Sequence, residues 1–218
     1  MKGLLVKDFK LLMLQKNIFW LELVIVIGLF VFTEDVSFPL AFLCFVVSLF
    51  TLSTISYDEF DNGNAFLFTL PIDRNSYVIE KYCLGLLFGG ASWVLATALG
   101  VIATVFKGTL AIIDFTMIAL LILPIMIVIQ AIMLPFQLKF GGDKGRIAMI
   151  GAFGALAVIA LIIVKGAKAV FNIDLVYVFN HLPTISMGMF VVIAVMIALV
   201  LLFVSMKISL SVMNKKEF

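Results

Sequence analysis

The chain has 218 residues, of which 64% are hydrophobic and 13% are charged, and its mean hydropathy is +1.26. Soluble domains are about 45–50% apolar and about 25% charged, so this composition excludes an ordinary soluble protein. Several apolar runs reach the about 20 residues that a helix needs to cross a bilayer, and they lack the alternation typical of a membrane β-barrel. The net charge of +2 is too small to indicate a partner by itself. The sequence therefore predicts an all-α integral membrane protein.

Residues 1–16 form the first element. Leu5, Phe9 and Leu12 recur at helical spacing, while lysines occupy most of the other side. The segment is too charged to span a bilayer, so we expect an amphipathic helix that lies at the interface with its lysines towards lipid headgroups. The apolar run that follows ends in Thr33-Glu34-Asp35 without a small-residue cleavage site. We therefore interpret it as an uncleaved anchor and not as a signal peptide.

Six apolar stretches are expected to span the membrane, at roughly 18–32, 38–55, 82–106, 115–136, 147–164 and 185–206. The second carries several hydroxyl side chains, which can bond to their own helix, bond to a neighbouring helix or line a wet cavity. The third contains Gly85 and Gly89, a spacing that lets two helices approach closely. Residues 165–184 are too polar to span, and we expect them at the interface. The prediction is a single domain of six transmembrane helices.

The longest polar interruption is the loop at residues 57–81. Its charged side chains surround a short apolar segment from Ala65 to Leu70, and Pro71 follows directly. Such a segment is either a solvated connector or a surface that binds a partner. Pro71 fixes its own backbone and disfavours helix at the residue before it, so we expect the apolar segment to end there.

The basic residues predict the orientation of the chain. Twelve of the fifteen lysines and arginines lie in the arm, the 57–81 loop, the turn at 137–146 and the carboxy-terminal tail. The opposite connectors hold only Lys107, Lys165 and Lys168. Because cytoplasmic loops carry an excess of positive charge, both termini and the 57–81 loop are expected in the cytoplasm.

Catalytic motifs are missing from the sequence. His181 is the only histidine, no HExxH motif occurs, and Gly-Gly-Asp-Lys-Gly at 141–145 lacks the spacing of a phosphate-binding loop. We expect no cofactor or metal in this chain and read Cys44 and Cys83 as small hydrophobic residues.

Glu22 is the one ionisable residue inside an apolar run, close to its edge. An ion-coupled carrier normally places more charges deep in its spans, so this class is disfavoured. Glu22 is expected near the cytoplasmic boundary in a charge pair with Lys81 or Lys207, with simple snorkelling of the carboxylate to the interface as the alternative.

Three segments carry a resemblance to a known family. They are Met-Lys-Gly-Leu-Leu-Val-Lys-Asp-Phe at 1–9, Tyr57-Asp58-Glu59, and Leu70-Pro71-Ile72-Asp73-Arg74 followed by Tyr77-Val78-Ile79-Glu80-Lys81-Tyr82. Together they resemble the permease subunits of type-2 ABC transporters, in the compact bacterial branch whose permease and ATPase are separate polypeptides. Asp73 departs from the pattern, because a small hydroxyl residue is common at that position.

The resemblance implies a dimer of six-span subunits in the bacterial cytoplasmic membrane, each with a cytoplasmic ABC ATPase that binds ATP and Mg²⁺. No Walker motif occurs in this chain, so the ATPase is supplied by another polypeptide. The arm would be an interfacial connecting helix, the 57–81 loop would carry a coupling helix, and residues 165–184 would form external interfacial helices. Expected partners are the ATPase, a second permease subunit and membrane lipids, with no nucleic acid.

The same resemblance assigns site residues. Phe66 and Leu70 would anchor the ATPase, with Asp58, Glu59 and Arg74 as a charged rim and Pro71 as the end of the coupling segment. The translocation path would include Ser48, Thr51 and Phe153. Apolar spans with few deep charges suit export of an amphipathic or lipid-like cargo, such as peptide toxins or antimicrobials. The alternative is a non-transporting membrane assembly or sensor protein that recruits a soluble partner through the 57–81 loop.

Overall fold

A computed structural model describes residues 2–60, 63–108, 110–142 and 186–216, together with residues 144, 145, 147, 150, 151, 154, 158, 162 and 165. Every regular element given for these residues is a helix, which confirms the all-α prediction. The helices are α1 (Lys2–Leu14), α2 (Lys16–Phe32), α3 (Ser37–Glu59), α4 (Gly63–Leu67), α5 (Arg74–Lys107), α6 (Ile112–Phe140) and α9 (Met187–Lys215).

Within the described residues, α3, α5, α6 and α9 are each long and apolar enough to cross a membrane. The helices α1 and α2 meet at a bend of 64° and add a fifth candidate if the pair counts as one broken span. The expected spans at 18–32, 38–55, 82–106, 115–136 and 185–206 correspond to α2, α3, α5, α6 and α9. The expected span at 147–164 lies largely outside the described residues, and the 165–184 segment almost entirely so. The six-span count therefore stays a prediction.

The polar loop is shorter than the sequence suggested. Helix α3 continues to Glu59, and α5 already begins at Arg74, eight residues before the expected start of the third span at 82. Asp73 is the N-cap residue of α5, but its side chain makes no capping hydrogen bond. The sequence predicted a loop for the charged residues at the end of α3 and the start of α5, because charged side chains are usually exposed to solvent. Several of them are buried and paired instead, as described below.

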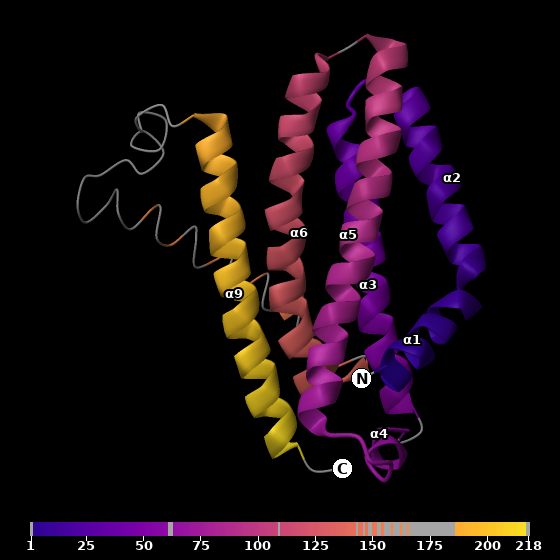
Figure 1. The fold of residues 1–218 in the computed structure, drawn as a ribbon, viewed down its shortest axis with the longest axis vertical. Coiled ribbons are helices and arrows are strands. Elements are labelled where there is room, and N and C mark those ends of the chain that lie inside the picture. Colours follow the sequence, from indigo (N-terminus) through magenta and orange to yellow (C-terminus); the bar gives the residue numbers. More distant parts are fainter. Residues whose placement is uncertain are drawn as a thin grey trace.

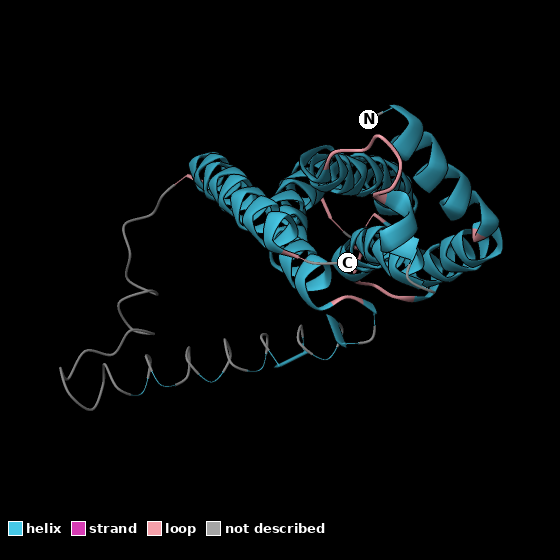
Figure 2. Ribbon diagram, turned by 90° about the horizontal axis from the view of Figure 1, so that it is seen from below, coloured by secondary structure: helices cyan, strands magenta, loops and turns pink. Residues whose placement is uncertain are grey.

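The helices pack side by side, with α2 on one flank and α9 on the other (Figure 1). Helix α6 packs along α9, α3 packs along α5, and both α3 and α5 also contact α6. The helix α1, the short helix α4 and both chain termini lie at the same end of the bundle. Seen from that end, the amino-terminal arm runs along the outside of the bundle (Figure 2), where it contacts α2, α3 and α5.

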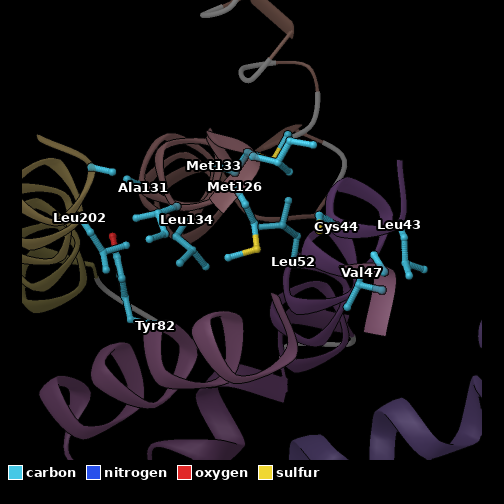
Figure 3. Packing of buried hydrophobic residues seen from close by; sticks show 14 of the residues in the cluster. Leu43, Cys44, Val47, Leu52, Tyr82, Met126, Ala131, Met133, Leu134 and Leu202 are labelled. Atoms are coloured by element: carbon cyan, nitrogen blue, oxygen red, sulfur yellow. The ribbon is translucent and has the colours of Figure 1, made fainter. Parts of the chain in front are cut away.

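The core lies between α3, α5, α6 and α9 (Figure 3). Tyr82 of α5 is 3% exposed, and its hydroxyl lies 2.6 Å from Ser205 Oγ and 2.8 Å from Ser209 Oγ of α9. Trp93 Nε1 donates to the Ala119 carbonyl of α6 at 2.7 Å. Because hydrocarbon does not draw apolar helices together, such polar contacts and close packing hold helices in a membrane.

Gly89 explains why α5 and α6 approach so closely. A Cβ atom at this position would lie 2.8 Å from both Met126 Sδ and Gln130 Nε2 of α6, closer than van der Waals contact allows. Gln130 Nε2 instead donates to the Gly85 carbonyl at 2.8 Å and to Ser48 Oγ of α3 at 3.3 Å. The expected packing role of the two glycines is thus confirmed, and Gln130 joins three helices at one point.

Candidate functional site

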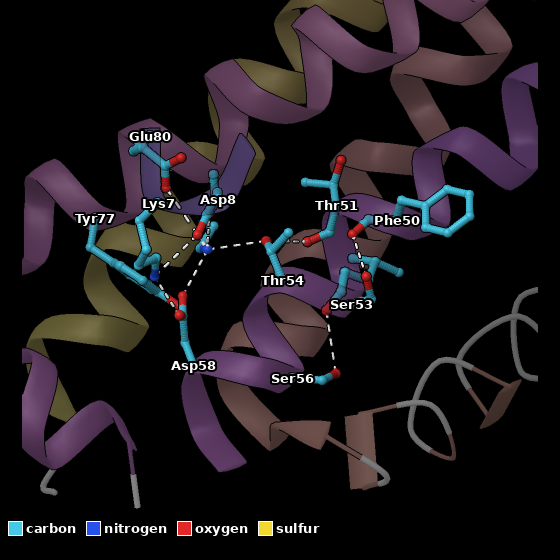
Figure 4. Close-up of polar contacts among 12 residues, drawn as sticks. Lys7, Asp8, Phe50, Thr51, Ser53, Thr54, Ser56, Asp58, Tyr77 and Glu80 are labelled. Atoms are coloured by element: carbon cyan, nitrogen blue, oxygen red, sulfur yellow. Dashed lines mark hydrogen bonds and ion pairs between the residues drawn. The ribbon is translucent and has the colours of Figure 1, made fainter. Parts of the chain in front are cut away.

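A cluster of buried charged side chains joins α1, α3 and α5 at the end of the bundle that carries α4 (Figure 4). Lys7 and Asp8 come from α1, Asp58 from α3, and Tyr77 and Lys81 from α5; we call these five residues the ion cluster. The side chains of Lys81 and Asp8 are 0% exposed and that of Asp58 is 7% exposed. Charged side chains lose their hydration when they are buried, so each of them needs a partner in a fixed position.

Lys81 is the centre of the ion cluster. Its Nζ atom forms ion pairs with Asp8 and, at 2.8 Å, with Asp58 Oδ2, and it donates to Thr54 Oγ1 at 3.1 Å. Tyr77 donates its hydroxyl to Asp58 Oδ2 at 3.1 Å. The amino-terminal arm is thereby fastened to both helices that flank the α4 loop.

Lys7 completes the ion cluster from the solvent side. Its Nζ atom pairs with Asp58 and lies 3.1 Å from Asp8 Oδ1, while its side chain stays 31% exposed. Burial alone would lower the pKa of Lys7, but the hydrogen bond and charge of Asp58, with those of Asp8, raise that pKa above its ordinary value of 10.5. Lys7 therefore keeps its positive charge throughout the physiological pH range.

The ion cluster corrects the expectation for Asp58. The sequence suggested an exposed carboxylate on a rim, whereas the structure buries Asp58 between Lys7, Lys81 and Tyr77. Burying a charge is tolerable only when partners and hydrogen bonds compensate for the lost hydration, which these three side chains do. Asp8, Thr54 and Tyr77 were not identified from sequence. The one available signal was the Lys7-Asp8 pair on an otherwise lysine-rich arm.

Glu59 and Arg74 also bind within the chain. Glu59 accepts from the Gly142 amide at 2.7 Å and from Lys216 Nζ at 2.8 Å. Arg74 donates to the carbonyls of Met213 at 3.2 Å, Asn214 at 3.1 Å and Lys216 at 2.9 Å. Both charges thus connect the α4 loop to the end of α6 and the end of α9. They do not stand free as a charged rim.

Helix α4 carries the apolar segment of the loop. Leu67 and Phe68 pack against the core, whereas Phe66 is 70% exposed and Leu70 is 44% exposed. Gly63 lets α4 start directly against α3, since a Cβ there would lie 2.8 Å from the Asp58 carbonyl oxygen. The backbone after α4 turns at Leu70-Pro71 and reaches the start of α5 at Arg74.

Two further aromatic side chains are exposed at the same end of the bundle, and one of them, Tyr57, accepts a hydrogen bond from Gln15 Nε2 at 3.0 Å. Tyr57 is 53% exposed and Phe60 is 74% exposed, both at the end of α3. Beside them lies a cavity of about 920 Å³ lined by the ends of α3, α4, α6 and α9, including Lys139, Lys144 and Lys216. We call Tyr57, Phe60, Phe66 and Leu70 the docking face. Isolated exposed apolar residues are ordinary, but four at one end of the bundle are typical of an interaction surface.

Glu22 does not form the expected charge pair. It lies in α2 at 5% exposure, and both carboxylate oxygens lack a hydrogen-bond partner among the described residues. Lys81 belongs to the ion cluster, and Lys207 is exposed on α9 with its Nζ 5.0 Å from the centre of the Phe203 ring. The structure therefore gives Glu22 neither of the two expected partners, since Lys81 pairs with Asp8 and Asp58 and Lys207 lies against Phe203. At 5% exposure, the carboxylate does not reach the surface of this chain as the snorkelling alternative would require.

The expected path residues lie in different surroundings. Ser48 donates to the Cys44 carbonyl at 2.7 Å and lines an apolar cavity of about 310 Å³ between α3 and α6. Thr51 is 1% exposed, and Phe153 lies outside the described residues. Thr54 and Ser56 likewise donate to carbonyls of their own helix at 2.8 Å and 3.3 Å. Of the three possibilities, bonding within the helix and bonding to a neighbouring helix both occur, since Gln130 donates to Ser48 Oγ and Gln137 donates to Ser56 Oγ. A transport path is not tested by these contacts.

The part of the chain that the structure describes contains no group of three or more His, Cys, Asp or Glu side chains arranged to hold a metal ion. A family model described as "ABC-2 family transporter protein" matches residues 3–214. No curated protein and no solved structure matches the chain.

Proposed function

The chain belongs to the ABC-2 transporter family, and we propose that it is the membrane-spanning permease subunit of an ATP-driven exporter. Members of this family are membrane components of transporters and carry no catalytic domain of their own. ATP hydrolysis would take place on a separate cytoplasmic ATPase, bound at the end of the bundle that carries α4. The docking face is the observation that supports this proposal most directly.

The docking face has the composition of a protein interface. Phe66 would be its central anchor, since it is 70% exposed on a helix whose other side packs into the core. Aromatic side chains that enter a partner's pocket supply most of the binding free energy of an interface. Phe60 and Tyr57 would enlarge the contact, and the lysines of the neighbouring cavity would contribute a polar border.

The contacts around α4 offer a route from the ATPase to the spans. Glu59 and Asp58 end α3, Arg74 begins α5, and each is bonded to another part of the bundle. A displacement of α4 would therefore move the ends of α3 and α5 together with α1 and α9. Such rigid coupling is what an ATPase needs to change the arrangement of membrane helices.

The proposal also covers the orientation of the chain in the membrane, its assembly with a second subunit and the class of cargo. Both termini lie at the α4 end, and the distribution of lysine and arginine favours a cytoplasmic location for that end. A second permease subunit would complete the transporter across the membrane. Apolar spans favour an amphipathic or lipid-like cargo, with peptide toxins or antimicrobials as candidates. Ser48, Thr51 and Phe153 remain the proposed path residues.

The test of the docking face is binding of the partner ABC ATPase, which is to be sought first among the genes next to this one. Detergent-purified permease carrying Phe66→Ala should bind this ATPase roughly 30-fold more weakly, because truncating a central anchor typically costs about 2 kcal/mol or more. Phe106→Ala is the matched control, since Phe106 is 86% exposed at the far end of α5. Equal binding by both variants and the unchanged protein would contradict the docking assignment.

A second measurement separates transport from mere recruitment. Pro71→Ala frees the backbone at the end of the α4 loop, so the ATPase should still bind while ATP hydrolysis no longer drives export. Export is measured with proteoliposomes, and hydrolysis with the same complex. A complex that binds the ATPase but exports none of the tested amphiphiles, even without substitutions, would favour the assembly or sensor alternative.

A further inference from the structure

A cavity of about 300 Å³ lies between α2, α3 and α5, separate from the ion cluster and from the docking face. Trp20, Ala91 and Leu95 are exposed at its mouth, while Glu22, Leu43 and Val47 are buried within it. The mouth opens between helices of a multi-pass membrane protein, and an apolar surface of such helices is expected to face lipid. The cavity is therefore open to a molecule that arrives through the bilayer.

Glu22 gives this cavity its chemistry. The side chain is 5% exposed and lines the cavity, and neither carboxylate oxygen has a hydrogen-bond partner among the described residues. A carboxylate inside a membrane protein normally pairs with a cation or a donor, and one without a partner marks a functional position. Glu80 of α5 is also buried without a hydrogen-bond partner in the described part of the chain, but its carboxylate lies 3.9 Å from Lys81 Nζ. Asp8 and Asp58 likewise have lysine partners, whereas no ion pair is found for Glu22 among the described residues.

The rest of the lining suits one class of ligand. Apart from Glu22, the only polar side chain is Ser92, whose hydroxyl donates to the Gly89 carbonyl at 2.7 Å and so presents its oxygen as an acceptor. Phe19, Trp20 and Phe88 supply aromatic rings. A carboxylate and a hydroxyl acceptor bind a protonated amine, aromatic faces attract cations, and the remaining aliphatic lining receives an apolar chain.

We propose that this cavity binds a cationic amphiphile, with its protonated amine on Glu22 and its apolar chain against the aromatic wall. Its volume lies at the lower end of the range for small-molecule pockets, about 300 Å³, which fits an alkylamine and not a folded peptide. That this ligand is a transported cargo rests on the proposed exporter function. That the cavity binds the ligand does not depend on that function.

Trp20 provides the readout. The chain has two tryptophans, so the Trp93→Phe variant leaves Trp20, at the cavity mouth, as the only tryptophan, which is excited selectively at wavelengths that tyrosine does not absorb. The full-length variant is placed in phosphatidylglycerol nanodiscs and titrated with a tail-brominated dodecylamine, whose bromine quenches nearby tryptophan. Tail-brominated dodecanol is the neutral probe of the same length. Saturable quenching is expected from the amine at concentrations at least tenfold below those that the alcohol requires.

Substitutions test the role of the carboxylate. In the same background, Glu22→Gln should weaken amine binding at least tenfold and remove the preference over the alcohol. Glu34→Gln, at an exposed acidic residue outside the cavity, is the matched control and should bind like the parent. Leu95→Trp fills the mouth and is read by displacement of a radiolabelled dodecylamine. It should block binding while leaving Glu22 in place, which keeps the test valid if Glu22→Gln alters folding.

The outcomes separate this inference from the proposed function. Equal quenching by amine and alcohol, or unchanged amine binding by both cavity variants, overturns it. If phosphatidylethanolamine in the nanodisc removes the binding of added dodecylamine, the site belongs to a lipid headgroup and the free amphiphile is excluded. Failure of the ATPase to bind, with amine binding intact, overturns only the exporter proposal.

Discussion

The ion cluster and Glu22 are two solutions for buried charge within one bundle. In the ion cluster, Lys81 pairs with Asp8, with Asp58 and, at 3.9 Å, with the adjacent Glu80, and every carboxylate of the cluster has a cation. Glu22, in α2, is equally buried but has no hydrogen-bond partner among the described residues. The charges of the ion cluster hold α1, α3 and α5 together, whereas the carboxylate of Glu22 can still bind a ligand. Burial alone therefore does not indicate what a charged residue does; its partners do.

Breaking the ion cluster at its centre should have the largest effect. Lys81→Met leaves Asp8 and Asp58 buried with less compensation, and loss of one partner of a buried pair typically costs about 3–5 kcal/mol. The free energy of unfolding, measured by denaturant titration in detergent micelles, should fall by that amount. Lys207→Met removes an exposed lysine of α9 and should change it by less than about 0.5 kcal/mol. A similar small change for Lys81→Met would refute the structural role.

Asp58→Asn should have a smaller effect in the same direction. The amide keeps the shape and can still accept from Tyr77, but it loses the charge that faces Lys7 and Lys81. The expected loss is about 2 kcal/mol, within the range for hydrogen bonds to charged groups. This corrects the weak rim effect that the sequence suggested. The loss should shrink in the Lys81→Met background, and additivity of the two substitutions would contradict their direct contact.

Glu22→Leu should change stability in the opposite direction. Removing a carboxylate that has no partner from an apolar environment should raise the free energy of unfolding by about 1–2 kcal/mol, less than the roughly 2.5–3.5 kcal/mol cost of a charge at a span centre, because Glu22 is nearer an end of α2. The same denaturant titration measures it. A loss of stability would show that Glu22 has structural contacts, and the contrast between the two regions would disappear.

Lys7→Met should produce the smallest effect. Its side chain is 31% exposed, and water already screens part of its attraction to Asp58 and Asp8, so about 0–1 kcal/mol is expected. Because the ion cluster raises the pKa of Lys7, this contribution is fully present below about pH 10.5 and is lost only as pH rises above that. Unfolding measured at pH 7 and pH 9 should therefore show the same difference between Lys7→Met and the unchanged protein.

The fold was largely predictable because membrane helices follow directly from long apolar runs. Five expected spans correspond to described helices, and the arm at residues 2–16 forms α1. The ends of α3 and α5 were misplaced because charges near 58 and 81 look like loop residues in one dimension. The two charges pair with each other, and a third segment, α1, adds Lys7 beside Asp58 and Asp8 beside Lys81. No pattern in the sequence brings residues 8, 58 and 81 together.

The candidate site was predictable only in part. Phe66 and Leu70 were expected to be available to a partner, and both are exposed. Asp58, Glu59 and Arg74 were expected on the same surface, but each makes contacts across a long sequence separation. Apolar exposure can be read from a short amphipathic segment, whereas the partner of a charge depends on how distant helices meet.

The contacts of Arg74 have a mechanical consequence. The guanidinium of Arg74, the first residue of α5, donates to carbonyls at the end of α9. The start of α5 and the end of α9 are therefore held together. Because α9 also packs along α6, a displacement that reaches Arg74 should be passed to α9 and α6 together.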